Sequence, residues 1–233
     1  MSSYRIAGLL VEMDTFGRTA RQAAPYQTAD AAPDMTVRAE PKVLAQAAQM
    51  GRDYAEYLAT GASFYRQLVR FDGMMLHASC VVVDGRAYLF SAPCGTGKST
   101  HVSLWLREFG DRAYILNDDK PALRFLPDGT LRVFGTPWCG KHGLSRNADA
   151  PLGGIAFLER AKENAIRPMS GKEAVYALME QTVRKLPGEQ ILQCMELIDR
   201  IVAGGKLWKL SCNMKPAAAR LSYQTMSGKG VLE

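Results

Sequence analysis

The sequence lacks the paired cysteines that mark a disulfide framework or a structural zinc site. Its five cysteines are odd in number and include no Cys-x-x-Cys pair, whereas such sites use closely spaced pairs. Long apolar runs are missing as well: no stretch approaches the ~18 apolar residues of a membrane span, and the N-terminus shows no charged-then-apolar signal. These absences predict a cytoplasmic protein with reduced thiols and no membrane partner.

Basic runs are also missing. The net charge is +6, but Lys and Arg are scattered and not interleaved with aromatic residues, so no nucleic-acid partner is expected. With 233 residues, 47% of them hydrophobic, the chain can bury a full core. We expect one compact unit, made of an N-terminal strand, arm and helical segment at 1–72 and a larger domain at 73–233.

The most informative segment that is present reads A-P-C-G-T-G-K-S, beginning at Ala92 and following an apolar strand. Gly95 and Gly97 allow backbone N–H groups to turn inward around phosphate oxygens, where a Cβ would clash. Lys98 supplies a point charge and the Ser99 hydroxyl can ligate Mg²⁺. The consensus begins with glycine where this chain has Ala92, but the strand before the loop and the helix after it favour a phosphate-binding loop over a plain glycine-rich turn. The predicted nucleotide-binding residues are Cys94, Gly95, Thr96, Gly97, Lys98, Ser99 and Thr100.

A second cluster of polar residues follows the next predicted strand, which ends in Asn117-Asp118-Asp119. The carboxyl ends of strands are where open α/β sheets bind ligands. One carboxylate is expected to hold Mg²⁺ and the other to act as general base for an acceptor hydroxyl; two turn-forming Asp residues before Pro121 are the structural alternative. His77 lies on the strand before the loop-bearing one, where a hairpin would bring it near the carboxylates.

The apolar pattern predicts alternating strands and helices, with a largely helical C-terminal third. Residues 14–40 are expected to form a hairpin or an irregular arm. The segment 41–71 is expected to be helical with a break near Thr60-Gly61. Strands are predicted at 4–13, 74–83, 88–90, 113–116, 123–126, 131–134, 155–158 and 207–210, with turns at Asp84-Gly85 and Asp128-Gly129, and further helices at 99–109, 175–186, 191–202 and 216–226.

The order of three motifs, H-A-S at 77–79, G-T-G-K-S at 95–99 and N-D-D at 117–119, resembles the HPr serine kinase/phosphorylase C-terminal domain. Phosphoenolpyruvate carboxykinase has a similar nucleotide-binding core. The run at 134–152 looks like small bacterial HPr-kinase-like proteins, some of which modify peptide natural products. The resemblance implies an α/β fold with a P-loop core of this type, a mixed sheet with flanking helices, and ATP and Mg²⁺ as cofactors.

Carried over by motif, the resemblance assigns roles to individual residues. Asp118 would take a proton from the acceptor hydroxyl with His77 tuning it, while Asp119 would bind the metal, although the two carboxylates could trade roles. Arg146 matches by position a γ-phosphate-contacting arginine of carboxykinase. The implied catalytic residues are Asp118, His77, Lys98 and Arg146, and the implied metal ligands are Ser99 and Asp119.

The expected activity is ATP-dependent transfer of the γ-phosphoryl group to a hydroxyl of a peptide, a protein or a small metabolite. The alternatives are a nucleotide-binding protein without transfer activity and a bifunctional kinase/phosphorylase. Carboxykinase activity is not expected, because 1–70 is too short for a separate oxaloacetate site. A homo-oligomer is left open by the resemblance.

Overall fold

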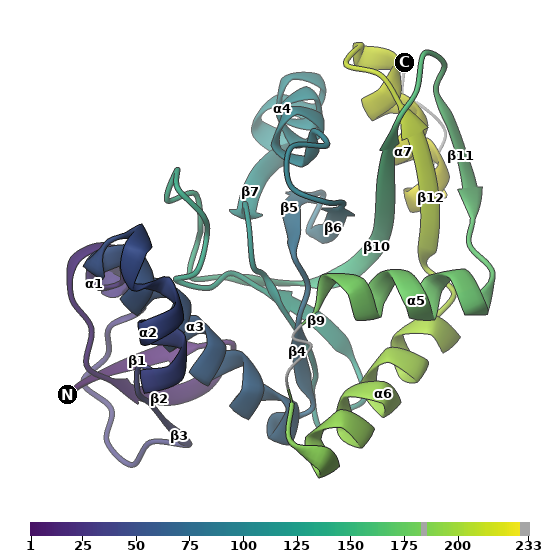
Figure 1. The fold of residues 1–233 in the computed structure, drawn as a ribbon. Helices are drawn as coiled ribbons and strands as arrows, with labels where there is room; N and C mark the ends of the chain where they lie inside the picture. Colours follow the sequence, from purple (N-terminus) through teal and green to yellow (C-terminus); the bar gives the residue numbers. More distant parts are fainter. Residues whose placement is uncertain (183–185, 229–233) are drawn as a thin grey trace.

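A mixed sheet of nine strands runs through the larger part of the molecule (Figure 1). The structure is a computed structural model that describes residues 1–182 and 186–228. The strand order is β4-β8-β9-β10-β6-β5-β7, with β12 beside β10 and β11 beside β12. The strands are β4 (Gly73–Met75), β5 (Ala78–Val83), β6 (Arg86–Ser91), β7 (Ala113–Asn117), β8 (Ala122–Phe125), β9 (Leu131–Phe134), β10 (Asp149–Arg160), β11 (Ala165–Pro168) and β12 (Leu207–Cys212).

Four of these strands run in the same direction. β10 pairs in parallel with both β6 and β12, and β5 pairs antiparallel with both β6 and β7, so β7 runs parallel to β6. The carboxyl ends of β6, β7, β10 and β12 therefore meet at one edge of the sheet, where β5 begins. This edge is where ligands bind in open α/β sheets.

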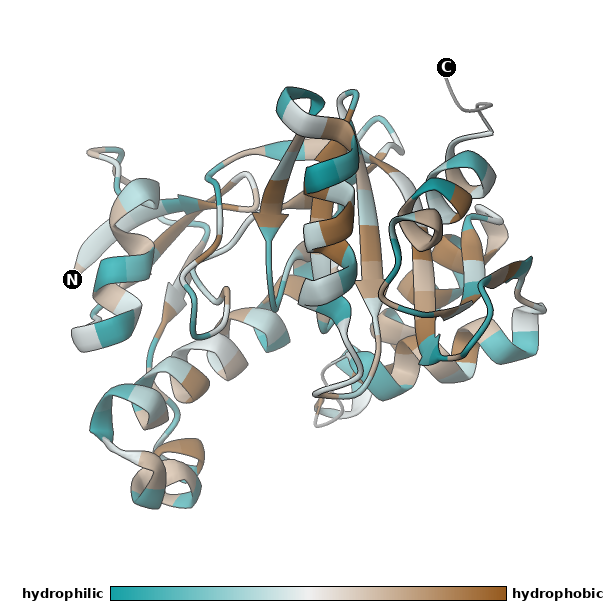
Figure 2. Ribbon diagram, turned by 90° about the horizontal axis from the view of Figure 1, so that it is seen from above, coloured by the Kyte–Doolittle hydropathy of each residue, from teal (hydrophilic) through white to brown (hydrophobic). Residues whose placement is uncertain are grey.

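Helices cover both faces of the central strands, because successive residues of a strand point to opposite faces. Val81 and Val83 lie in the cluster packed by α4 (Lys98–Phe109) and α7 (Pro216–Ser227). Cys80 and Val82 lie in the cluster packed by α5 (Gly171–Gln181) and α6 (Gly188–Ala203). Figure 2 shows the apolar colouring along the central strands behind α4. The α/β class with a mixed sheet and flanking helices is thus confirmed.

The N-terminal part forms a smaller three-stranded sheet with its own helices, in purple and blue in Figure 1. Its core also contains Ala122, Phe134 and Trp138 from the larger part. Its elements are β1 (Ser2–Ile6), β2 (Leu9–Met13), β3 (Met35–Val37), α1 (Gly17–Ala23), α2 (Pro41–Ala47) and α3 (Arg52–Leu68). Short 3₁₀ helices are η1 (Ala24–Tyr26), η2 (Ala48–Met50), η3 (Val69–Phe71) and η4 (Gly110–Arg112).

Several predicted boundaries differ from the structure. The segment 4–13 is a hairpin rather than one strand, because Ala7 and Gly8 turn with φ of 53° and 76°. The helix break near Thr60-Gly61 is wrong: α3 continues through both residues, and the interruption lies at Gly51, where φ is 92°.

Two further differences lie in the larger part. The strand expected at 74–83 is divided into β4 and β5. The helix expected at 175–186 ends at Gln181, and its positions 183–185 lie outside the described residues. No helix in the described ranges is long and apolar enough to cross a bilayer.

Candidate functional site

A cleft of about 460 Å³ lies at the carboxyl edge of the large sheet, and we call it the phosphate cleft. It brings together three segments that the sequence predicted: the glycine-rich loop after β6, the carboxylates after β7 and His77 just before β5. Its lining residues are Arg18, Tyr54, Tyr57, His77, Cys94, Gly95, Gly97, Lys98, Ser99, Thr100, Asp118, Asp119, Gly140, Lys141 and His142.

The glycine-rich loop has the backbone that its glycines predict. Gly95 and Gly97 adopt φ of 79° and 121°, a region that side chains disfavour. Space is not the constraint, since a Cβ at either position would meet nothing within 4 Å. Lys98 begins α4 with 9% of its surface exposed, and its Nζ donates to the Ala92 carbonyl at 2.9 Å. Burial lowers the pKa of Lys98. The Lys98 ammonium therefore lies at the N-terminus of α4. A cation at a helix N-terminus favours binding of an anion.

Asp118 faces the hydroxyl of the loop. Its Oδ1 accepts a hydrogen bond from Ser79 Oγ at 2.7 Å, and its Oδ2 accepts one from Ser99 Oγ at 3.2 Å. The adjacent Ser99 and Asp118 oxygens fit the magnesium preference for one or two carboxylates completed by phosphates and water. No group of three or more His, Cys, Asp or Glu side chains that could hold a metal occurs within 1–182 and 186–228.

Asp119 has a different set of partners. Its Oδ1 lies 3.4 Å from His77 Nε2, and its Oδ2 is paired with the Lys120 ammonium and accepts from the Tyr57 hydroxyl. The structure therefore pairs His77 with Asp119, whereas the resemblance had implied that His77 acts on Asp118. Because two neighbouring residues after a strand point in different directions, Asp118 faces the loop and Asp119 faces the N-terminal part.

The imidazole of His77 is oriented from its other nitrogen. Nδ1 lies 3.1 Å from Gln181 Oε1 and Nε2 lies 3.4 Å from Asp119 Oδ1, so these two contacts hold the ring between α5 and the carboxylate. Burial, together with the charge of Lys98, lowers the pKa of His77. The surroundings therefore favour the neutral ring over the imidazolium.

Asn117 holds the two carboxylates in place, a role that the sequence analysis did not assign. Its buried side chain accepts at Oδ1 from the backbone N–H groups of Asp119 and Lys120, at 2.9 and 2.7 Å. Its Nδ2 donates to the Thr136 carbonyl at 3.0 Å. An Asn before two Asp residues at a strand end was the available signal, because Asx side chains bond to N–H groups two or three residues ahead.

Arg146 is the one predicted site residue outside both the phosphate cleft and the loop. Its guanidinium lies over the Tyr114 ring at 4.3 Å, and the side chain is exposed. The arginine that does line the cleft is Arg18 of α1, which lies 4.3 Å from the Tyr57 ring. Sequence reasoning missed Arg18 and Tyr57 because both come from the N-terminal part, far from the motifs along the chain.

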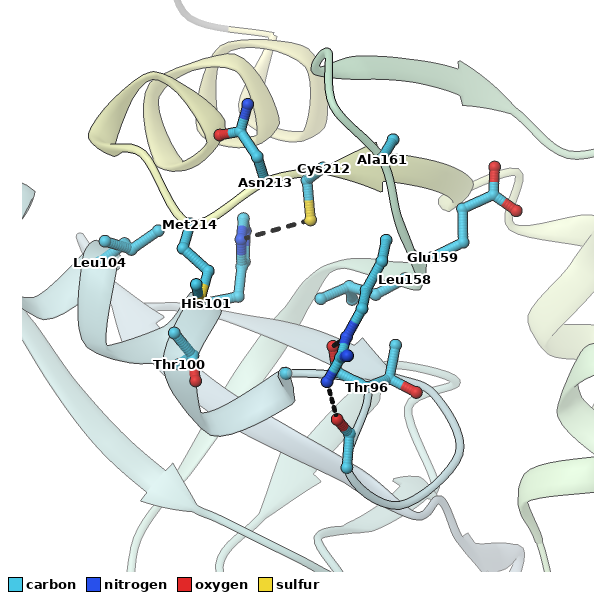
Figure 3. Close-up of a pocket in the computed structure, with 13 residues that line it drawn as sticks. Thr96, Thr100, His101, Leu104, Leu158, Glu159, Ala161, Cys212, Asn213 and Met214 are labelled. Carbon is cyan, nitrogen blue, oxygen red and sulfur yellow. Dashed lines mark hydrogen bonds between the residues drawn. The ribbon is translucent and has the colours of Figure 1, made fainter.

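A second pocket, of about 390 Å³, shares Gly95, Gly97 and Thr100 with the phosphate cleft, and we call it the loop pocket. Figure 3 shows Leu104 and Met214 on one side of it and Leu158 on the other. Thr96, predicted to contact nucleotide, lines this pocket and not the phosphate cleft. At its edge Arg160, the last residue of β10, donates to the carbonyls of Gly95 and Thr96 at 2.5 and 3.1 Å.

Comparisons with known proteins identify a family and also find solved structures that resemble the chain only weakly. No curated protein matches the chain. Among solved structures, the HPr(Ser) kinase/phosphatase from Coxiella burnetii is similar at 15% identity with a TM-score of 0.30, covering 56% of this chain and 88% of that one. The family model described as SynChlorMet cassette protein ScmC matches residues 55–202. Since that match spans more than half of the sequence, the chain belongs to the ScmC family.

Proposed function

We propose that this protein is an ATP-dependent kinase that transfers the γ-phosphoryl group to a hydroxyl acceptor. One observation carries the proposal: the glycine-rich loop with Lys98 and Ser99 lines the same cleft as two carboxylates, one of which contacts an imidazole. Phosphoryl transfer needs positioning and charge stabilisation around the phosphates, together with a group that accepts the hydroxyl proton. All of these groups line this cleft.

The loop side would bind the donor. The Lys98 ammonium would exchange the Ala92 carbonyl for phosphate oxygens, and the N–H groups at the start of α4 would point at the same anion. Ser99 and Asp118 would hold Mg²⁺, which neutralises phosphate charge when bound. This assignment moves the metal role from Asp119 to Asp118, because Asp118 is the carboxylate that contacts Ser99.

Asp119 would be the general base. It takes the proton from the acceptor hydroxyl as the acceptor oxygen bonds to the γ-phosphorus, and the bond from that phosphorus to the β–γ bridging oxygen breaks to release ADP. His77 is a positioning residue here, because its Nε2 lies 3.4 Å from Asp119 Oδ1 and orients that oxygen. Lys120 pairs with Asp119 Oδ2 and holds the other side of the carboxylate.

The loop pocket would hold the nucleoside end of the donor. It shares loop residues with the phosphate cleft but does not include Asp118, so a nucleotide lying across the loop would reach the carboxylates with its γ-phosphate and the pocket with its base. Met214, 76% exposed at the rim, is an apolar side chain that a bound base would cover.

The test is transfer of labelled phosphate from [γ-³²P]ATP, with Mg²⁺, into the peptides and metabolites of a cell extract. The wild-type protein should label a product, and Lys98→Ala should not. Arg107→Ala, an exposed change on α4, is the matched control and should behave as wild type. A nucleotide-binding protein without transfer would bind ATP and label nothing. Release of ATP or pyrophosphate from the labelled product by added ADP or inorganic phosphate would reveal the reverse activity.

A further inference from the structure

A third cavity, of about 430 Å³, continues the phosphate cleft away from the loop, and we call it the basic groove. It shares Arg18, Lys141 and His142 with the cleft, so the two spaces are joined. The groove runs between α1 and the 140–143 turn. It is lined by Arg18, Arg21, Gln22, Pro25, Tyr26, Lys141, His142, Gly143 and Ser145.

The charge of the groove has one sign. Its lining contains Arg18, Arg21, Lys141 and His142 but no Asp or Glu. Arg18, Arg21 and Lys141 form no ion pair with any residue of 1–182 or 186–228, whereas other arginines such as Arg112 are paired with carboxylates. Unpaired cations that converge on one hollow favour an anionic ligand.

The groove is held in shape by contacts between the N-terminal part and the turn. Gln22 Nε2 donates to the Gly140 carbonyl at 2.9 Å, and the Gly140 N–H donates to the Tyr57 hydroxyl at 3.0 Å. Gly140 also lies against the proposed base, since a Cβ there would come within 3.1 Å of Asp119 Cβ. The turn that lines the groove therefore also borders Asp119.

The opening of the groove into the phosphate cleft indicates which anion fits. A ligand that spans both spaces must carry its negative charge beside the hydroxyl that would reach Asp119. Among the proposed hydroxyl acceptors, a peptide can carry carboxylate side chains next to a Ser or Thr, and each carboxylate can pair with one of the cations.

We propose that the basic groove binds the acceptor as a peptide in which acidic residues flank the hydroxyl-bearing residue. The role of the hydroxyl as phosphoryl acceptor rests on the proposed function. Binding of the acidic residues beside it does not require phosphoryl transfer. Arg21 and Lys141 would contact the peptide carboxylates. The groove then sets which hydroxyl reaches Asp119.

The experiment measures fluorescence anisotropy of a short labelled peptide with one central Ser flanked by Glu. A matched peptide carries Gln in place of every Glu. The full chain should bind the Glu peptide about tenfold more tightly, and added salt should remove the difference. Arg21→Glu and Lys141→Glu should each weaken the Glu peptide by about tenfold, because reversal replaces an exposed attraction by a repulsion.

Matched controls separate this proposal from the kinase proposal. Arg107→Glu should leave peptide binding unchanged, and a fluorescent ATP analogue should bind Arg21→Glu as it binds wild type. Equal affinity for the two peptides, no binding of either, or tighter binding of a single-stranded oligonucleotide would overturn the acidic-peptide site. Binding of the Glu peptide, together with no labelled product in the cell extract, would leave the site standing and refute the kinase.

Discussion

The proposed donor wall of the phosphate cleft and the proposed acceptor wall, which continues into the basic groove, hold their charged side chains by different means. On the donor wall, formed by strand ends of the large sheet, each charged side chain already has a partner: Lys98 donates to a carbonyl, Asp118 accepts from two hydroxyls and Asp119 pairs with Lys120. On the acceptor wall, formed by α1 and the 140–143 turn, Arg21 and Lys141 have no carboxylate partner within the described ranges. The charged groups of the donor wall are therefore partnered within the protein, while Arg21 and Lys141 of the acceptor wall face no carboxylate among the described residues.

The largest expected effect divides the donor wall between its two carboxylates. We expect Asp119→Asn to lower the rate of transfer by about 10³-fold, because the amide cannot take the hydroxyl proton. Nucleotide affinity should be unchanged. Asp118→Asn should instead raise the Mg²⁺ concentration needed for half-maximal rate, since Asp118 is the carboxylate beside Ser99. Steady-state kinetics over a series of Mg²⁺ concentrations would distinguish the two variants. If Asp119→Asn kept its turnover at saturating Mg²⁺, Asp118 and not Asp119 would be the general base.

The next effect concerns the packing between the N-terminal part and the larger part of the molecule, which we call the joint. Trp138 follows β9, is fully buried, and stacks on Phe64 of α3 with ring centroids 4.8 Å apart. We expect Trp138→Ala to lower the free energy of unfolding by about 3–5 kcal/mol. Tyr176→Ala, an exposed aromatic at 61%, should change it by less than about 0.5 kcal/mol. Urea unfolding followed by circular dichroism measures both, and equal effects would show that the joint carries no special share of stability.

The third prediction concerns the support beneath the acceptor wall. Glu56 of α3 is 2% exposed and accepts a hydrogen bond from Thr19 of α1, while its Oε1 has no partner within the described residues. Burial raises the pKa of Glu56 from 4.5 to about 7. Between these two pKa values, Glu56 is protonated in the folded protein and ionised in the unfolded chain. The free energy of unfolding should therefore fall as pH rises through this range, by about 3 kcal/mol in all.

Glu56→Gln should abolish that dependence. The variant keeps an oxygen for Thr19 but carries no charge, so it should match wild type near pH 4.5 and exceed it in stability at pH 8. Glu163→Gln, at an exposed position, serves as control and should keep the wild-type slope. The same slope in Glu56→Gln and wild type, in urea unfolding at several pH values, would place the titration elsewhere.

What the sequence could and could not predict follows the same division. The donor wall was predictable because the phosphate loop is a local motif and the parallel strands bring their carboxyl ends to one edge, where the loop, Asp118 and Asp119 meet. The acceptor wall depends on packing between distant segments, such as Tyr57 against Gly140. No periodicity or spacing records such contacts. The sequence also could not predict which carboxylate contacts His77. The backbone turn after β7 decides which of the two adjacent carboxylates faces the ring.

The smallest effect is expected from substitution of Arg146. This variant tests whether the donor wall includes a residue that lies outside the cleft in this structure. Its guanidinium lies over the Tyr114 ring outside the cleft, so Arg146→Ala should change the rate less than about twofold and the free energy of unfolding by about 0.5–1 kcal/mol. Arg18→Ala, inside the cleft, should raise KM for the acidic peptide about fivefold. Steady-state kinetics on both variants checks this order. A loss of about 10² in rate on Arg146→Ala alone would mean that Arg146 leaves Tyr114 and reaches the transferring phosphate when nucleotide binds, and the donor wall would then be incomplete without its ligand.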